Sequence, residues 1–128
     1  MLYLAEHFAK LMDSGRYDEA GEILAENCQY SIRDKTLKGR SEIIKSYKDA
    51  HKAGESKLDE IVFSSKVEPL YDNSFKLHYL DRLRKSNKWH EHRCEQVIKF
   101  ENNKITDIVH IDLAGEAEAL QEFFKAHQ

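Results

Sequence analysis

The stretch FKLHYLDRLRKSNKWHEHRCEQVI, residues 75–98, decides the fold. Apolar and polar side chains alternate along both of its halves, which is the period of a β-strand. Ser86-Asn87 lies between the halves and suits a two-residue turn. In the register set by that turn, oppositely charged side chains face each other: Arg82 faces Glu91, and His78 faces Glu95. The stretch therefore predicts an antiparallel hairpin with one charged, complementary face.

The same register makes the other face of the hairpin mostly apolar. Its facing pairs are Phe75 with Ile98, Leu77 with Gln96, Tyr79 with Cys94, and Asp81 with His92. A shift of one residue would exchange the two faces and destroy both patterns. We therefore expect this second face to cover the interior and to carry a few polar groups within it.

Elements on both sides of the hairpin follow from the spacing of apolar residues. Working outward, we expect a helix through Leu4–Met12 that stops at Ser14-Gly15, a short helix through Tyr17–Leu24, a strand at 29–32, a tight hairpin at 34–39, a helix through Ile43–Ala50 that stops at Gly54, strands at 61–67 and 104–112, and a last helix at 114–127. Three helices therefore precede a run of long antiparallel strands.

Composition limits the class of protein. The 128 residues are 41% hydrophobic with a net charge of −3, which fits one globular domain spanning 1–128. The mixed charge predicts no nucleic-acid partner, and no apolar run reaches membrane-spanning length. Cys28 and Cys94 form no disulfide framework, so reduced thiols in a cytoplasmic protein are expected.

Three segments carry a resemblance to a known family. They are LMDSGRYDEAGEILAENCQY (11–30), LKGRSEIIKSY (37–47) and FENNKITDIVHID (100–112). In this order they resemble the nuclear transport factor 2-like superfamily, which includes SnoaL-like polyketide cyclases and ketosteroid isomerases. The resemblance implies an α+β fold: a cone-shaped α+β roll, cystatin-like, with N-terminal helices packed on a strongly curved, mostly antiparallel sheet and a C-terminal helix. It also implies a cavity that the helices close.

The resemblance does not extend to the residues of ketosteroid isomerase. By position, the tyrosine of that family's first helix falls on Phe8, its general-base aspartate on Ile32, and its second acidic donor on Gln96. All three roles are missing here. The fold is therefore expected without that particular chemistry.

Candidate catalytic residues lie on the inward face of the predicted hairpin. Asp81 opposite His92 places a carboxylate beside an imidazole, which is equipment for general acid–base catalysis. His110 and Asp112 also point inward if the last strand has the bulge that family members often show near Ile105. A structural reading stays open, in which Asp81 and His92 are partners at the rim of the sheet.

The remaining inward residues predict the wall of a ligand cavity. They are Phe8, Tyr30, Tyr47, Tyr79, Cys94, Gln96 and Ile98. We expect an apolar small molecule there, handled by an isomerase, cyclase or dehydratase that uses acid–base chemistry on a cyclic substrate. The alternative is a non-catalytic homodimerisation or ligand-sensing module.

The histidines of β-strand segment 90–92 do not predict a metal site. His90 and His92 share one strand face with Cys94, and His110 could supply a third ligand. Such a pair is typical of cupin barrels, but three helices before the sheet argue against a cupin. We expect neither a metal nor another cofactor.

The outer face of the sheet predicts a homodimer. Leu80, Trp89 and Val97 form a stripe there among Arg82, Arg93 and Glu95. An exposed tryptophan among arginines suits a contact between two copies of the chain.

Overall fold

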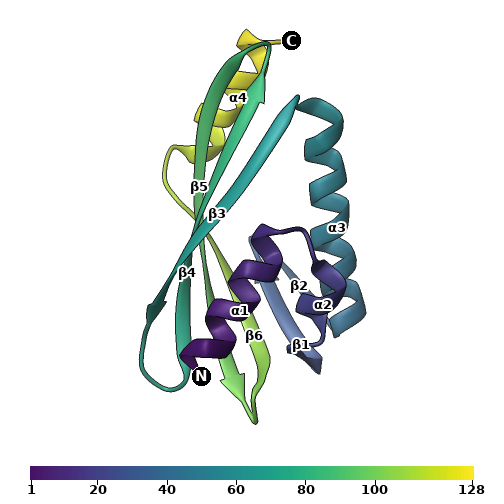
Figure 1. The fold of residues 1–128 in the computed structure, drawn as a ribbon, viewed down its shortest axis with the longest axis vertical. Helices are drawn as coiled ribbons and strands as arrows, with labels where there is room; N and C mark the ends of the chain where they lie inside the picture. Colours follow the sequence, from purple (N-terminus) through teal and green to yellow (C-terminus); the bar gives the residue numbers. More distant parts are fainter.

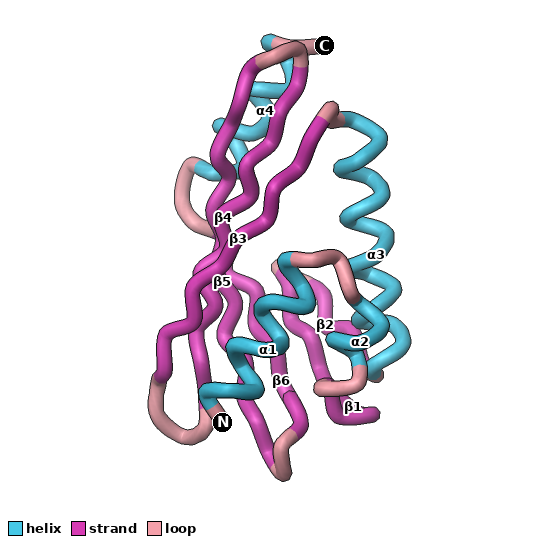
Figure 2. Tube along the Cα trace, viewed as in Figure 1, coloured by secondary structure: helices cyan, strands magenta, loops and turns pink.

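The computed structural model describes all 128 residues as four helices and six strands (Figure 1). The elements are α1 (Leu2–Asp13), α2 (Tyr17–Gly21), β1 (Leu24–Ile32), β2 (Lys35–Lys38), α3 (Arg40–Lys57), β3 (Glu60–Pro69), β4 (Ser74–Lys85), β5 (Lys88–Glu101), β6 (Lys104–Asp112) and α4 (Glu116–Ala126). Figure 2 shows how few residues lie outside these elements. The predicted order of helices and strands is confirmed.

The six strands form one curved, mixed sheet in the order β2-β1-β6-β5-β4-β3. β1 runs parallel to β6, and every other neighbouring pair is antiparallel. The predicted cone-shaped α+β roll with a mostly antiparallel sheet is confirmed. β4 and β5 pair in the predicted register over their whole length, from Phe75 opposite Ile98 to Lys85 opposite Lys88.

Tight turns hold the long strands in this register. Ser86 and Asn87 have φ of 53° and 63°, and Asn102 and Asn103 have φ of 50° and 63°. Positive φ at both central residues matches the twist of two-residue hairpins, and asparagine tolerates it better than most residues. The predicted turn at Ser86-Asn87 is therefore confirmed, and Asn102-Asn103 forms a second turn of the same kind.

The last strand contains the bulge on which the inward position of His110 depended. Lys99 of β5 pairs with Asp107, whereas the next residue, Phe100, pairs with Ile105, so Thr106 is an extra residue in β6. A bulge shifts the alternation of side chains by one residue. As a result His110 lies opposite Gln96, on the inward face.

The helices cover the sheet at different places. Figure 1 shows α1 across the lower part of the sheet, α3 alongside it, and α4 behind the upper end of β4 and β5. The ring of His90 in β5 stacks on that of Phe123 in α4, with centroids 5.1 Å apart. None of the four helices combines the length and apolarity needed to cross a bilayer.

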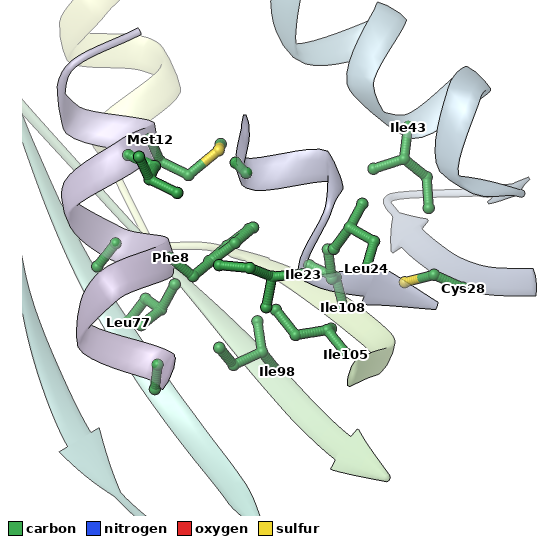
Figure 3. Close-up of a cluster of buried hydrophobic side chains, with 14 of the residues drawn as sticks. Phe8, Met12, Ile23, Leu24, Cys28, Ile43, Leu77, Ile98, Ile105 and Ile108 are labelled. Atoms are coloured by element: carbon green, nitrogen blue, oxygen red, sulfur yellow. The ribbon is translucent and has the colours of Figure 1, made fainter. Parts of the chain in front are cut away.

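The core lies between α1, α2, α3 and the lower part of the sheet (Figure 3). Its fully buried large side chains are Phe8, Leu24, Ile43, Leu77, Ile98, Phe100, Ile105 and Ile108. Burying such a side chain contributes about 1.5–3 kcal/mol. The upper part of the sheet has no comparable cluster, and the polar inward residues lie where the core ends.

Two predicted element ends were wrong. Leu24 begins β1 instead of ending α2, because its backbone pairs with Ile105 and its carbonyl accepts two hydrogen bonds from the Arg40 guanidinium, at 2.7 and 3.1 Å. Helix α3 continues through Gly54 to Lys57. A Cβ on Gly54 would lie 3.1 Å from the Ile61 side chain, so this glycine permits close packing of α3 on β3.

Candidate active site

A cavity of about 350 Å³ opens where the apolar core ends. Its wall comes from α1, α2, α3 and the concave face of the sheet: Met12, Asp13, Tyr17, Tyr30, Ile32, Arg33, Tyr47, Ala50, Phe63, Tyr79, Asp81, His92, Cys94, Gln96, His110 and Asp112. All four predicted catalytic residues lie in this wall. So do five of the seven predicted ligand-binding residues: Tyr30, Tyr47, Tyr79, Cys94 and Gln96.

Phe8 and Ile98 do not reach the cavity, so their predicted place in its wall was wrong. Both are completely buried in the core beneath it (Figure 3). The inward direction of the two side chains was predicted correctly. Helix α1 packs closely on the lower sheet, and apolar side chains therefore fill the space that would have extended the cavity downward.

A larger groove of about 680 Å³ lies outside the cone, between the β1–β2 hairpin and α3. Mostly charged and polar surface side chains line it, including Lys35, Glu42 and Lys45. The smaller cavity is the better candidate site, because it brings ionisable groups together among aromatic walls and away from bulk water.

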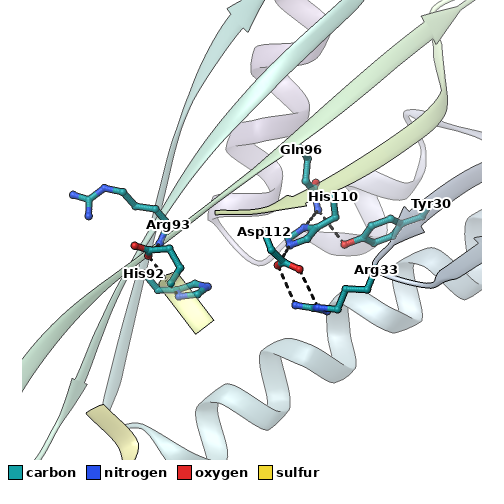
Figure 4. A network of polar contacts seen from close by, with 8 residues as sticks. Tyr30, Arg33, His92, Arg93, Gln96, His110 and Asp112 are labelled. Carbon is teal, nitrogen blue, oxygen red and sulfur yellow. Dashed lines mark hydrogen bonds and ion pairs between the residues drawn. The ribbon is translucent and has the colours of Figure 1, made fainter. Parts of the chain in front are cut away.

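Gln96 is at the centre of a hydrogen-bond network on one side of the cavity (Figure 4). Its amide oxygen accepts from the Tyr47 hydroxyl at 3.0 Å. Its amide nitrogen lies 3.1 Å from the Tyr30 hydroxyl oxygen and 3.2 Å from Nδ1 of His110. Each hydrogen-bonding atom of the buried amide thus has a partner. We call Gln96, Tyr30, Tyr47, His110, Asp112 and Arg33 the Gln96 network.

The network determines which nitrogen of His110 carries a proton when the ring is neutral. Nδ1 accepts from the Gln96 amide, so the proton lies on Nε2, which donates to Asp112 at 3.0 Å. Arg33 holds the same carboxylate through Nε at 3.0 Å and Nη2 at 3.1 Å. These contacts therefore fully engage both His110 and Asp112.

Asp81 and His92 occupy facing positions on β4 and β5 but do not touch, so the predicted direct pair was wrong. The nearest acidic group to the imidazole is Glu116 of α4, with Oε1 3.8 Å from Nδ1. Glu116 also accepts a hydrogen bond from the Arg93 backbone amide at 2.6 Å. The sequence pattern showed which strand positions face each other. It could not show that Glu116 of α4 is the acidic group nearest to the His92 imidazole.

The second acidic neighbour of the site is Asp13, at the end of α1. Its Oδ2 accepts a hydrogen bond from the Ser65 hydroxyl at 2.6 Å. Burial, and to a smaller extent the negative charge of Asp13, together raise the pKa of Asp81 to about 6. Burial also raises the pKa of Asp13, while its Ser65 hydrogen bond opposes that change. Burial thus makes the ionised form of both carboxyls less favourable than it is in water.

Two oxygen atoms at this end of the cavity have no hydrogen-bond partner. They are the hydroxyl of Tyr79 and Oδ1 of Asp13, and both are shielded from solvent. Two ring nitrogens on β5 are also shielded and unpartnered: Nδ1 of His92, which lies in the cavity wall, and Nε2 of His90. Burial keeps the pKa of the Tyr79 phenol well above its usual value, so the hydroxyl stays protonated. Such unpaired groups are rare in protein interiors because each is unfavourable by about 1–3 kcal/mol. We call Asp13, Tyr79 and Asp81 the acidic end of the cavity.

The Cys94 thiol is not a competing nucleophile. Burial, together with the negative charge of Asp81, raises the pKa of the Cys94 thiol to about 12, so the thiolate nucleophile is absent at neutral pH. Burial lowers the pKa of His92. No group of three or more His, Cys, Asp or Glu side chains has the arrangement of a metal site.

Sequence reasoning missed Asp13, Tyr17, Arg33 and Phe63 in the cavity wall. Phe63 belonged to the predicted apolar alternation of β3, and that signal was available. Asp13 is the last residue of α1 and Arg33 lies in the turn after β1. At such positions no periodic pattern of apolar residues shows where a side chain points. Arg33 also has a φ of 52°, a left-handed backbone conformation that is uncommon for arginine and that its neighbours in the sequence do not predict.

Comparisons with known proteins fit this geometry at the level of the fold. No protein-family model and no curated protein matches the sequence. A candidate polyketide cyclase from Xanthomonas campestris superposes with a TM-score of 0.71 at 11% identity, over 99% of this chain and 96% of that chain. An LEH-like epoxide hydrolase from M. tuberculosis reaches 0.68 at 12% identity, over 97% and 91%.

A third similar structure is a nuclear transport factor 2-like protein of unknown function from Exiguobacterium, with a TM-score of 0.63 at 9% identity over 87% of this chain and 98% of that one. At such identities the likeness concerns the fold alone. The chain has the nuclear transport factor 2-like fold, as its sequence predicted.

Proposed function

We propose that the cavity binds a small, mostly apolar molecule and that the Asp81 carboxyl exchanges a proton with it. One observation carries this proposal: a largely buried carboxyl with a pKa near 6 lies in the wall of an aromatic-lined cavity and has no cationic partner. General bases work best when their pKa is near the working pH. Just above pH 6 the group is ionised and still basic enough to accept a proton.

The surrounding groups suit an isomerase, cyclase or dehydratase acting on a cyclic substrate. The Tyr79 hydroxyl is protonated and unpartnered, so it can donate to a substrate oxygen on which negative charge develops. Tyr30, Tyr47 and Phe63 offer apolar surface for the rest of the molecule. The enzyme names of two structural neighbours, a candidate polyketide cyclase and an epoxide hydrolase, support an enzyme over a purely structural module.

The proposal can be tested without knowledge of the natural substrate. Cyclohexanone and 2-cyclohexenone exchange their α-hydrogens for deuterium when a base abstracts them, and NMR follows the exchange in D₂O. We expect the protein to accelerate the exchange and Asp81→Asn to lower the acceleration by about a hundredfold or more. Asp72→Asn removes the same charge from an exposed turn and should change nothing. Equal exchange by Asp81→Asn and the wild type would refute the role of Asp81.

We also propose a homodimer through the outer sheet face, which a ligand-sensing module would share. Val62, Trp89 and Val109 are 38%, 45% and 45% exposed there, and the guanidinium of Arg82 lies 5.0 Å from the Trp89 ring centroid. An interface on this face should bury more than about 1,000 Å² in total. Light scattering at high micromolar concentration should give the dimer mass, and Val109→Glu should shift it to the monomer. A wild-type monomer under these conditions would contradict the proposal.

A further inference from the structure

The acidic end of the cavity lacks positive charge. Arg33 is the only lysine or arginine among the lining residues. Its guanidinium is occupied, because Nε and Nη2 both contact the Asp112 carboxylate, at 3.0 and 3.1 Å. Asp13 and Asp81 therefore have no cation of their own. Charged groups in a protein interior are normally paired, and an unpaired one is strongly unfavourable.

An independent observation at the same place also calls for a ligand. The Tyr79 hydroxyl is shielded from solvent, unpartnered, and part of the cavity wall. Oδ1 of Asp13 is likewise unpartnered, although Ser65 holds the other oxygen of that carboxylate in a fixed position. Neither protein nor bulk water satisfies these two oxygens. A ligand that reaches these two oxygens from the cavity would supply the missing hydrogen bonds.

We propose that the acidic end binds the ammonium group of a small organic amine, whose apolar ring or chain lies in the rest of the cavity. The inference rests on the proposed function, because it names the substrate class of the same cavity. A primary ammonium has three N–H donors. The acidic end offers a matching set of acceptors: Oδ1 of Asp13, the Asp81 carboxylate and the Tyr79 oxygen.

The two carboxylates then have different roles. Asp13 is fixed by Ser65 and supplies a counter-charge, while Asp81 has the freedom to exchange a proton with the substrate. The neighbouring wall suits the apolar part of an amine. The rings of Tyr17, Tyr47 and Tyr30 stack in a row with centroid separations of 6.2 and 5.4 Å, and aromatic surfaces attract cations as well as apolar groups.

A neutral ligand would behave in the opposite way with pH. An ammonium group gains affinity as pH rises through the titration of Asp81, because the carboxylate becomes charged. A neutral ligand gains nothing from that charge and loses affinity if it accepts the proton of the acid. The ionisable groups around Asp81 are Asp13 from α1, Tyr17 from α2, Tyr79 from β4, and His92 and Cys94 from β5. Because burial lowers the pKa of His92 from its usual value, its imidazole carries little positive charge at pH 7.5 and does not repel the cation.

Three probes of equal size separate these cases: cyclohexylmethylamine, cyclohexylmethanol and cyclohexanecarboxylate. At pH 7.5, titration calorimetry and NMR should show the amine binding at least about tenfold more tightly than the alcohol, with the carboxylate weakest. Amine affinity should fall about tenfold between pH 7 and pH 5, following the pKa of about 6 of Asp81.

Variants locate the site of binding. Asp13→Asn keeps an oxygen for the Ser65 hydrogen bond but removes the charge, so it should weaken the amine about tenfold and leave the alcohol within about twofold. Asp81→Asn should act in the same direction and provides a second variant should Asp13→Asn be unstable. Asp72→Asn, in an exposed turn, is the charge-matched control and should bind all three probes like the wild type.

The outcomes distinguish failure of this inference from failure of the proposed function. If the alcohol binds as tightly as the amine and shifts cavity resonances, the cavity binds small molecules but the preference for a cation is wrong. If the Asp13 and Asp81 variants bind the amine like the wild type, the acidic end is not its site. If none of the three probes binds in the cavity, both the inference and the proposed function are wrong.

Discussion

The two sides of the cavity are polar in different ways. On the Gln96 side, the buried amide has a partner for its oxygen and two for its nitrogen, and the chain of contacts continues through His110 to Asp112 and Arg33 (Figure 4). At the acidic end, two carboxylates share one region without a cation, and the oxygens of Tyr79 and Asp13 lack partners.

This difference separates structure from function within one cavity. A fully satisfied buried network rigidifies the protein and has little left to offer a ligand. Unpaired buried groups destabilise the folded protein, and they persist where a ligand completes them. We therefore assign the Gln96 network to holding the cavity open in one shape, and the acidic end to binding and chemistry. The predictions below test that division.

The largest effect is expected for Gln96→Leu. The substitution removes the hydrogen bonds of Tyr30, Tyr47 and Nδ1 of His110 together, at a position that is only 3% exposed. Leaving a buried polar group unsatisfied destabilises by about 1–3 kcal/mol. We expect the free energy of unfolding to fall by about 4 kcal/mol, as measured by urea denaturation.

Gln29→Leu provides the matched control, because Gln29 is an exposed residue of β1 and makes no side-chain hydrogen bond. It should change the free energy of unfolding by no more than about 0.5 kcal/mol. If Gln96→Leu were as harmless as this control, the Gln96 network would not be the structural side of the cavity.

At the acidic end, removing a polar group should raise the free energy of unfolding, the opposite of the effect expected for Gln96→Leu. A pKa of about 6 in the folded protein, against an ordinary value of 3.8, means that ionised Asp81 destabilises the fold. The folded state binds the Asp81 proton more tightly than the unfolded state, so the contribution of Asp81 to stability is greatest below pH 4 and is lost as pH rises through 6. Asp81→Asn removes this penalty, and we expect it to raise the free energy of unfolding at pH 8 by as much as about 3 kcal/mol.

Urea denaturation at several pH values checks both the size and the sign of the Asp81 effect. The variant and the wild type should be nearly equal at pH 4, where the carboxyl is protonated, and should diverge between pH 4 and pH 7. A variant that is less stable than the wild type at pH 8 would show that the carboxylate is structurally paired, and the contrast between the two sides would then fail.

Much of the fold was readable from local signals that agree with one another. The 75–98 hairpin was predicted residue by residue because its turn and its two alternating faces allow only one register. The bulge at Thr106 was reached through the family resemblance, since nothing in residues 104–112 marks it. The ends of α2 and α3 were wrong because backbone pairing at Leu24 and packing at Gly54 are decided by distant partners.

The site was predictable to the extent that strands define it. Strand alternation placed Tyr79, Cys94 and Gln96 in the cavity wall, because each side chain direction follows from the period of two. It could not show that Glu116 is the acidic group nearest to His92, nor that Asp13, at the end of α1, lies near Tyr79 and Asp81. Those contacts depend on how helices sit on the sheet, which no local period encodes.

The smallest effect is expected at the outer end of the Gln96 network, where Arg33 meets Asp112. Their side chains are 64% and 46% exposed, so water already solvates both charges and dissolved salt screens their attraction. We expect Arg33→Gln to lower the free energy of unfolding by no more than about 1 kcal/mol, and by less at 1 M NaCl, as measured by urea denaturation at both salt concentrations. The Gln96→Leu loss should not depend on salt, because it comes from neutral hydrogen bonds away from solvent. If Arg33→Gln destabilised the protein as much as Gln96→Leu, the stability supplied by the network would come from its charged end and not from the Gln96 amide.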